Sequence, residues 1–450
     1  MFAAKVTRRL LLRNALIAAG GLVAAACQPQ GGAGQPTAEP TKAAAQQPTT
    51  QPASPTKAPA APVEIVYYDR TTSAPKWADA YNAAQSKVKV SVQIQPPNTR
   101  YEQLVAQITA GNAPDVIGLD CVQVGRFAQL SALVPLGDLV SKQVLDSYFP
   151  QLVKTPHHFG TFGGQLLGLP FWLDLSVLFY NKALLQQAGG DPEAGIRSWD
   201  DYITYGKKVT KGDTVGFSIA QCLSSGFIGL PWIWAQGVDI FDKDFAKATI
   251  NTPEVIATLQ FLRDLVTVHK VTNDALGTDW NTMTSIFTGG KALIVHQGGG
   301  LVGLARKEFP ELWKVLGTCP IPGPKPGQKS SLIGGNVISM STQSKKREQA
   351  LDFMVWATAS EAGMAVTGDV GYMPGCPKGL DLPIYKNDWP VYKTFKEALE
   401  YGYPIWNHPR NDEFGSPRSD AYCAAVRGER PIAEIAAEWE RRTNEIIQRK

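Results

Sequence analysis

Hydrophobic and polar residues follow one another along the chain in blocks that predict strands and helices in turn. In the first part the expected order is strand, helix, strand, helix, strand, over residues 63–69, 74–85, 87–94, 101–113 and 114–120. Apolar strands that alternate with amphipathic helices are typical of a parallel sheet covered by helices. Ligands bind such sheets beyond the carboxyl ends of the strands, and Asp69, Arg70 and Asp120 fall at two of those ends.

The same alternation recurs less regularly along the rest of the chain. We expect a strand and helix over 175–189, a helix over 198–210 with Ser198 as its N-cap, a strand at 214–220, and helices over 344–360 and 432–450. A chain of 450 residues is also longer than one hydrophobic core normally serves. The sequence therefore predicts an α/β protein with two domains or lobes.

The segment ALIVHQGGGLVG (292–303) contains G-x-G-x-x-G after an apolar run, which is how a dinucleotide-binding turn begins. Such a site needs a long helix after the last glycine and an acidic residue about 20 positions further on. Here Pro310 cuts the following helix short, and residues 317–319 are Gly-Thr-Cys. The run is better interpreted as a tight strand-to-helix turn at the border of a cleft.

The amino-terminal segment reads as an export signal. Residues 1–26 lead from a basic part with Arg8 and Arg9 into an apolar stretch too short to span a bilayer, and the arginine pair resembles a twin-arginine signal. Small residues precede Cys27, as in a bacterial lipobox, so Cys27 is the expected site of lipidation. The alternative is cleavage after Ala26 to release a free protein.

Composition predicts a spacer after the signal and argues against one class of binding partner. Residues 28–62 consist mainly of Pro, Ala, Gln and Thr, which predicts a disordered spacer in a lipid-anchored linker over 27–62. Four of the 44 basic residues lie in the first 26 positions, which hold no acid, so the other 40 balance 40 acidic residues. A neutral body without a basic stripe argues against a nucleic-acid partner.

Sequence signatures of enzymes and cofactor sites are largely missing. We find no G-x-S-x-G, H-E-x-x-H or Walker A pattern, and the five cysteines after Cys27 contain no C-x-x-C pair. No catalytic residue, metal site or cofactor is therefore expected. An odd number of cysteines leaves at least one unpaired, and buried free thiols account for most of them.

Aromatic and polar residues in loops and at strand ends suggest a carbohydrate site. Sugar rings stack an apolar C–H face on aromatic side chains, while their hydroxyls need Asp, Asn, Gln and Arg partners. The candidate ligand-binding residues are Asp69, Arg70, Asp120, Trp172, Asp174, Trp232, Trp234, Trp280, Gln297, Asn336, Tyr372 and Trp406.

Several segments, taken in order, resemble the extracellular solute-binding proteins of bacterial ABC importers, specifically the sugar-binding family that includes maltose-binding protein. They are ITAGNAPDVIGLD (108–120), GLPFWLDLSVLFYNKALLQQAG (168–189), FTGGKALIVHQGGG (287–300) and LIGGNVISMSTQSKKREQALDFMVWATASEAG (332–363). The resemblance implies a two-lobe periplasmic-binding-protein fold of type II, with discontinuous lobes joined by hinge crossings. The expected amino-terminal lobe covers 63–170 plus 333–381, and the carboxy-terminal lobe covers 171–332 plus 382–450.

The resemblance also implies a function. It predicts a monomeric, extracytoplasmic protein, lipid-anchored on the outer face of the bacterial cytoplasmic membrane, that delivers a sugar to an ABC permease. Asp174 matches an acidic ligand contact near the hinge, whereas Gly300 stands where the family often has a stacking tryptophan, which disfavours a maltodextrin ligand. The alternatives are a polyol, polyamine or glycerol phosphate as the solute, or a secreted carbohydrate-active enzyme that uses Asp120 and Asp174 as its carboxylate pair.

Overall fold

The computed structural model describes residues 61–94, 100–154, 159–220, 226–243, 245–275 and 277–449. Both of its main sheets lie in one folded unit that spans residues 60–450. The predicted signal peptide with Arg8 and Arg9, the lipidation candidate Cys27 and the spacer as far as residue 60 lie outside the described residues.

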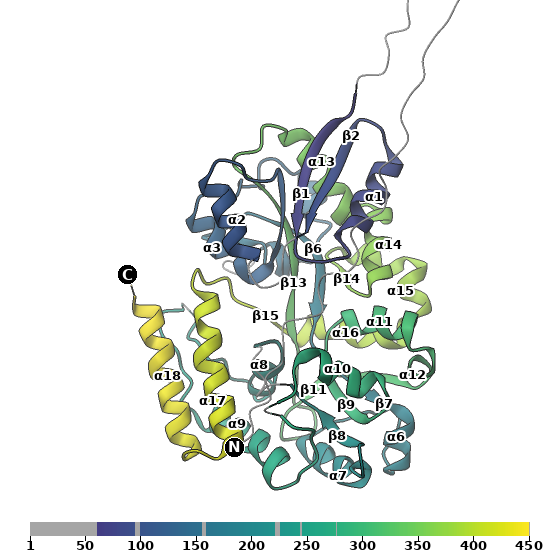
Figure 1. The fold of residues 1–450 in the computed structure, drawn as a ribbon, viewed down its shortest axis with the longest axis vertical. Helices are drawn as coiled ribbons and strands as arrows, with labels where there is room; N and C mark the ends of the chain where they lie inside the picture. The colour runs from purple at the N-terminus through teal and green to yellow at the C-terminus, as the bar shows by residue number, and fades with distance from the viewer. Residues whose placement is uncertain are drawn as a thin grey trace, which may run out of the picture. The chain divides into compact units, whose positions relative to one another are not determined.

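The first sheet contains the predicted strand–helix–strand–helix–strand unit (Figure 1). Its strand order is β14-β6-β13-β3-β1-β2, with β15 also paired to β13. The strands are β1 (Val63–Asp69), β2 (Val88–Ile94), β3 (Val116–Asp120), β6 (Leu169–Leu175), β13 (Leu332–Met340), β14 (Met373–Pro374) and β15 (Tyr403–Pro404). β1, β2 and β3 are parallel, as predicted, whereas β13 runs antiparallel to both β3 and β6.

Helices cover both faces of this sheet because its strands are apolar on both sides. On one face Tyr67 packs with α1 (Ala74–Ala84), α13 (Arg347–Ala359) and α14 (Glu361–Val370). On the other face Tyr68 packs with α2 (Arg100–Thr109) and α3 (Val124–Gln129). The predicted apolar face of α13, which consists of Ala350, Phe353, Met354 and Ala357, is completely buried.

The second sheet has the order β10-β7-β9-β8, and the apolar run before the glycines forms its buried strand β9. Its strands are β7 (Val177–Asn181), β8 (Val215–Ser218), β9 (Ala292–Gln297) and β10 (Leu316–Cys319). The associated helices are α6 (Lys182–Gln187), α7 (Trp199–Val209), α8 (Gly226–Trp234), α9 (Pro253–Thr267), α10 (Trp280–Thr288), α11 (Gly300–Glu308) and α12 (Pro310–Lys314). Ser198 caps α7 as predicted, because its side chain accepts a hydrogen bond from the Asp201 N–H.

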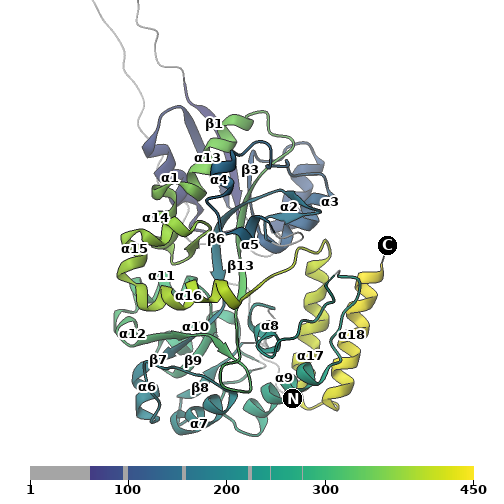
Figure 2. The ribbon, with the colours of Figure 1, turned by 180° about the vertical axis from the view of Figure 1, so that it is seen from behind.

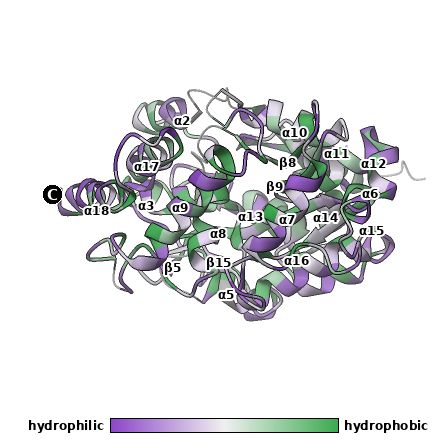
Figure 3. Cartoon of the chain, turned by 90° about the horizontal axis from the view of Figure 1, so that it is seen from below, coloured by the Kyte–Doolittle hydropathy of each residue, from purple (hydrophilic) through white to green (hydrophobic). Residues whose placement is uncertain are grey.

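The remaining elements are short, apart from the carboxy-terminal helices. They are η1 (Cys121–Gln123), α4 (Lys142–Leu145), α5 (Pro150–Val153), β4 (Thr161–Phe162), β5 (Gln165–Leu166), β11 (Ile321–Pro322), β12 (Lys329–Ser330), η3 (Pro377–Asp381), α15 (Pro383–Asn387), α16 (Trp389–Tyr401), η4 (Asn411–Phe414), α17 (Gly415–Arg427) and α18 (Ile432–Gln448). The helices α17 and α18 lie side by side and contact α9 (Figures 1 and 2). Hydrophilic residues colour much of α18 in Figure 3, while Ile435 and Trp439 bury its other face.

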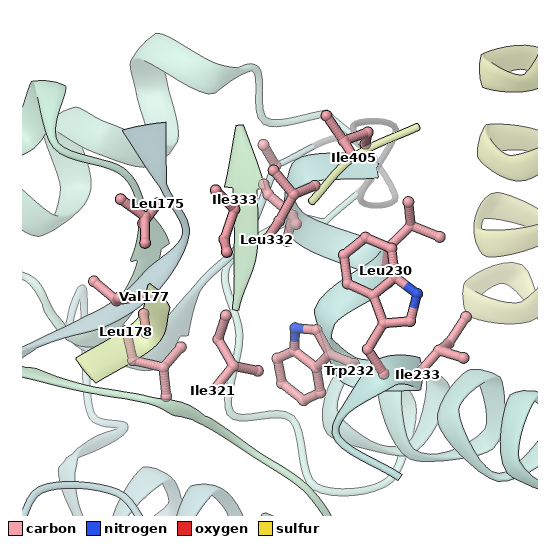
Figure 4. Packing of buried hydrophobic residues seen from close by; sticks show 14 of the residues in the cluster. Leu175, Val177, Leu178, Leu230, Trp232, Ile233, Ile321, Leu332, Ile333 and Ile405 are labelled. Atoms are coloured by element: carbon pink, nitrogen blue, oxygen red, sulfur yellow. The ribbon is translucent and has the colours of Figure 1, made fainter. Parts of the chain in front are cut away.

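The chain crosses between the sheets at Ser176, the single residue between β6 and β7. Ser176 N–H donates to the Leu332 carbonyl oxygen (3.0 Å), and Leu332 N–H donates to Ser176 Oγ (2.9 Å), so β13 begins at the same crossing. Leu175 and Val177 lie on either side of Ser176, near Ile333, in the hydrophobic core (Figure 4). The predicted lobe boundary at 170/171 falls inside β6, which continues in the first sheet to Leu175.

Three of the cysteines are buried free thiols, as expected: Cys121, Cys319 and Cys376. Cys423, in contrast, is disulfide-bonded. No helix within the described ranges is long and apolar enough to cross a membrane.

Candidate functional site

Three predicted site residues stand next to one another across the first sheet. The β13 residue Asn336 is paired with Asp120 on β3 and with Trp172 on β6. The Asn336 amide nitrogen faces Asp120 Oδ1 (3.3 Å) and the Leu119 carbonyl oxygen (3.1 Å), the orientation in which both contacts are hydrogen bonds. The strand register therefore fixes a polar row at the carboxyl end of β3.

Arg70, which follows β1, completes this row. Its Nε lies 2.7 Å from Asp120 Oδ1, and Tyr101 Oη on α2 donates to Asp120 Oδ2 (2.6 Å). Burial opposes the positive charge of Arg70, but Asp120, Tyr101, Tyr372 and Asp69 together outweigh this effect and hold the pKa of the guanidinium above its ordinary value. Both side chains are partly exposed, so the pair can still reach a ligand.

Trp172 is enclosed by aromatic and cationic neighbours. Tyr372, just before β14, stacks on its ring with a centroid separation of 4.1 Å and an interplanar angle of 16°. The Arg70 guanidinium carbon lies 5.4 Å from the same ring centroid. The Trp172 side chain is buried, and its Nε1 has no hydrogen-bond partner among the described residues. Trp172 is therefore as enclosed as a core indole, and this arrangement gives it no direct access to a ligand.

Asp174 joins the first sheet to the glycine-rich turn after β9. Gly299 N–H donates to Asp174 Oδ1 (2.7 Å) at the start of α11, where a helix favours negative charge. Burial raises the pKa of Asp174 to about 6, and the hydrogen bond from Gly299 lowers it in part. A methyl group on Gly298 would lie 2.1 Å from Asp174 Oδ1. The predicted strand-to-helix turn is confirmed, and its glycines let a carboxylate approach the backbone.

The second sheet adds aromatic and amide groups next to this turn. Trp280, the first residue of α10, is 39% exposed and meets Phe227 of α8 edge-to-face (6.3 Å, 70°). Phe227 Cζ would lie only 2.8 Å from a methyl group on Gly298, so Phe227, which meets Trp280, borders the Asp174 contact. Gln297, the last residue of β9, donates through Nε2 to Thr284 Oγ1 of α10 (2.8 Å). The exposed indole is a stacking surface that Trp172 is too enclosed to provide.

Asp69 lies close to these residues but is turned away from them. Alternation along β1 places it on the same face as Tyr67, where it is fully buried and accepts hydrogen bonds from Tyr67 Oη and from Thr71 N–H (2.7 Å). Burial raises its pKa. This placement gives Asp69 the role of holding the turn after β1 and does not support the predicted ligand contact.

Three of the predicted ligand-binding tryptophans lie in the core instead. Trp232 is surrounded by Tyr202, Phe217 and Phe261 and donates to His296 Nδ1 (3.4 Å; Figure 4 shows its hydrophobic surroundings).

Trp234 and Trp406 share one acceptor: their Nε1 atoms lie 2.8 Å and 3.3 Å from the two carboxylate oxygens of Asp239. All three indoles are at most 3% exposed, so the prediction that Trp232, Trp234 and Trp406 bind ligand is not supported. The physical reason is that their ring faces are already covered by protein.

Sequence reasoning overlooked Tyr101 and Phe227, and it assigned no ligand role to Gly298 and Gly299. Tyr101 stands at the start of a helix, where no pattern distinguishes it from a core aromatic residue. Phe227 belongs to an apolar block that reads as uniformly buried. The glycine run was the available signal for these positions, because consecutive glycines after a strand indicate that another group approaches the backbone closely.

Two further features lie away from these residues. A surface hollow of about 1010 Å³ at the opposite end of β3 is lined by Gly111 and by residues 342–349, except Lys346. No group of three or more His, Cys, Asp or Glu that could hold a metal ion occurs in the part of the chain that the structure describes.

Two helix-covered sheets joined at a narrow crossing, with a polar and aromatic cluster beside it, define a two-lobe binding protein. The chain belongs to the bacterial extracellular solute-binding protein family, whose model matches residues 76–393. Its fold is the two-lobe periplasmic-binding-protein fold of type II.

Known proteins support this assignment. The chain is 26% identical over 349 residues to an arabinooligosaccharide-binding protein of Halalkalibacterium halodurans, with 76% of each chain covered. It is 24% identical over 378 residues to a maltotriose-binding protein of Pyrococcus abyssi, covering 83% of this chain and 76% of the relative. A solved ABC transporter solute-binding protein of Thermotoga lettingae, bound with alpha-D-tagatose, superposes with a TM-score of 0.76 at 20% identity and covers 86% of this chain and all of its own.

Proposed function

We propose that this protein is the extracytoplasmic binding component of an ABC transporter and binds a sugar or short oligosaccharide between the two sheets. The observation that carries the proposal is the contact of Asp174 of the first sheet with the Gly298–Gly299 turn of the second, beside Phe227, which in turn meets Trp280. The two sequence relatives named above are an arabinooligosaccharide-binding and a maltotriose-binding protein, which agrees with this chemistry.

The chemistry of the cluster favours a neutral polyhydroxylated ligand. Carboxylate oxygens of Asp120 and Asp174 accept hydrogen bonds from hydroxyls, while Arg70 donates them. Trp280 offers an exposed ring for the apolar face of a sugar. Two carboxylates against one guanidinium repel a phosphate group, so glycerol phosphate fits less well than a sugar.

Export and anchoring complete the proposal. The predicted signal with Arg8 and Arg9 would export the protein, Cys27 would carry the lipid, and the spacer 28–62 would hold the body near the membrane. There a monomer would present its loaded form to the permease subunits. Replacing Cys27 with Ser should move the protein from the membrane fraction to the soluble extracytoplasmic fraction in cell fractionation. Retention in the membrane fraction would exclude Cys27 as the anchor.

A thermal-shift screen of the purified body tests the ligand class. We expect the melting temperature to rise with one or more of arabinotriose, maltotriose, diacetylchitobiose and tagatose, because a ligand held by the native state alone stabilises it, and not with glycerol 3-phosphate or spermidine. A rise with spermidine or glycerol 3-phosphate alone would contradict the proposal.

Substitution of Trp280 locates the site. We expect Trp280→Ala to weaken binding of the sugar found in the screen by about tenfold or more in calorimetry, because an aromatic contact surface is lost. Trp313→Ala, which removes a partly buried tryptophan from α12, is the matched control and should leave the affinity unchanged. Equal losses in both variants would count against a site at Trp280.

A further inference from the structure

The helices α11 and α14, which adjoin strands of different sheets, approach each other closely beside the proposed binding site. The helix α11 follows β9 of the second sheet, and α14 leads into β14 of the first sheet. A methyl group on Gly303 of α11 would lie 2.1 Å from the Val370 carbonyl oxygen of α14, and one on Gly299 would lie 2.8 Å from the Gly371 carbonyl oxygen. The glycines of the run therefore serve this contact between the two backbones.

Gly371 shapes the other side of the contact. It ends α14 in the left-handed conformation (φ +108°), which glycine adopts without strain. A methyl group there would lie 2.5 Å from Gly303 N and 2.6 Å from the Gly299 carbonyl oxygen. We call this contact, formed by Gly299, Gly303, Val370 and Gly371, the α11–α14 joint.

Arg306 fastens the joint one turn further along α11. Its Nη2 donates to the carbonyl oxygens of Gly368 and Asp369 (3.0 Å each), which belong to the last turn of α14. Its Nη1 lies 2.6 Å from Asp388 Oδ2, and both side chains are largely buried. A planar guanidinium can satisfy these three acceptors at once, whereas an ammonium group on a lysine cannot reproduce the arrangement.

The joint controls where the two halves of the proposed site meet. Gly299 belongs to the joint and also donates to Asp174, while Tyr372, next to Gly371, stacks on Trp172. Any movement of α11 away from α14 carries the Gly299 N–H away from Asp174 and shifts Trp172 relative to Trp280. We propose that Arg306 is a positioning residue for ligand binding, which holds the α11–α14 joint together and thereby sets the relative placement of the two sheets. The binding part of this inference rests on the proposed function.

Spin-label distances test the joint without any ligand. Labels at Lys87→Cys, before β2, and Lys211→Cys, before β8, report on the two sheets of a body without Cys27, and the free cysteines among the described residues are buried. We expect Arg306→Ala and Gly303→Ala each to lengthen or broaden the distance distribution in double electron–electron resonance, with Arg306→Lys intermediate. Arg263→Ala, which removes contacts within α9 alone, and Gly137→Ala, which has open space around it, are the controls.

Affinity provides the second readout. For the panel sugar that stabilises the wild type, Arg306→Ala should weaken binding about tenfold, Arg306→Lys less, and the controls should bind normally. Folded Arg306→Lys and Gly303→Ala variants with wild-type distances and affinity would overturn the inference, even if Arg306→Ala failed to fold. Changed distances in a protein that binds no panel sugar would uphold the joint and reject the proposed function.

Discussion

Asp174 is a partly buried carboxylate whose described hydrogen-bond donor is the Gly299 N–H at the start of α11. Its pKa of about 6 lies above the value near 4 of an unfolded chain, so the native state binds the proton more tightly. This group therefore stabilises the fold fully below about pH 4, and that stabilisation is lost as the pH rises through 6.

Asp174→Asn removes this titration but keeps an oxygen for the Gly299 N–H. We expect the free energy of unfolding of the variant, relative to wild type, to rise by up to about 3 kcal/mol between pH 4 and 7, when measured by urea unfolding. His296, whose pKa burial lowers to about 3, titrates in both proteins and cancels in the difference. A difference independent of pH would contradict this account.

Residues at strand ends were predictable because the hydrophobic pattern locates the ends of strands. Arg70, Asp120 and Asp174 follow or end apolar runs, and the structure brings them into one region. Whether a residue at a strand end faces the ligand also depends on the orientation of its side chain about the strand axis. Asp69 is adjacent to Arg70 in sequence yet points into the core. Alternation places Asp69 on the face of Tyr67, but both faces of β1 are buried, so the sequence does not show which face lies toward the ligand.

At the scale of elements, Asp239 links α8 to the segment that follows β15. It accepts hydrogen bonds from Trp234 at the end of α8 and from Trp406, and the two indoles also meet edge-to-face (5.7 Å, 77°). Substitution by alanine would leave two buried indole N–H groups without this acceptor, at a cost of about 1–3 kcal/mol each.

We therefore expect Asp239→Ala to lower the free energy of unfolding by about 2–5 kcal/mol without changing sugar affinity, as measured by denaturant titration and calorimetry. Trp280→Ala should show the opposite pattern, because its exposed indole contributes little to the core. Loss of affinity in folded Asp239→Ala would place Trp234 and Trp406 at the ligand after all.

The helices and strands that the pattern predicted lie within a few residues of the observed ones, whereas α9, α16, α17 and the crossing between the sheets were not predicted. Ser198 marks the start of α7, and Gly111, with positive φ, follows the end of α2. The segment LPFWLDLSVLFYN is apolar through both β6 and β7, so nothing in its periodicity marks Ser176 as the break. The break is set by pairing with β13 through Ser176 and Leu332, a contact between residues 156 positions apart.

At the scale of the whole folded unit, a second polar contact connects elements of the two sheets. The short helix η4 adjoins α17 and α18. Its residue Asp412 accepts hydrogen bonds from Gln123 Nε2 of η1 (2.6 Å) and from Arg126 Nη1 of α3 (3.0 Å). η1 directly follows Asp120 of β3, so this contact lies one short segment from the proposed ligand row. Together with the α11–α14 joint it ties the first sheet to the elements around the second.

The Arg126–Asp412 pair is partly exposed, at 29% and 52%, so it should contribute less than about 1 kcal/mol and weaken with salt. If the liganded form keeps this contact, Asp412→Asn should weaken sugar binding up to about fivefold at low salt and remove part of the salt dependence of wild-type affinity.

The Arg442–Asp420 pair is the matched control, because it has similar exposure (33% and 58%) and length (2.7 Å) but joins only α18 to α17. Asp420→Asn should therefore leave affinity and its salt dependence unchanged, in calorimetry at 20 mM and 500 mM sodium chloride. Equal effects of the two substitutions would mean that general surface charge, rather than a contact between the sheets, governs the response. An effect confined to Asp412→Asn would show that the contact of η4 with η1 and α3 contributes to ligand binding, because the Arg442–Asp420 pair does not join elements of the two sheets.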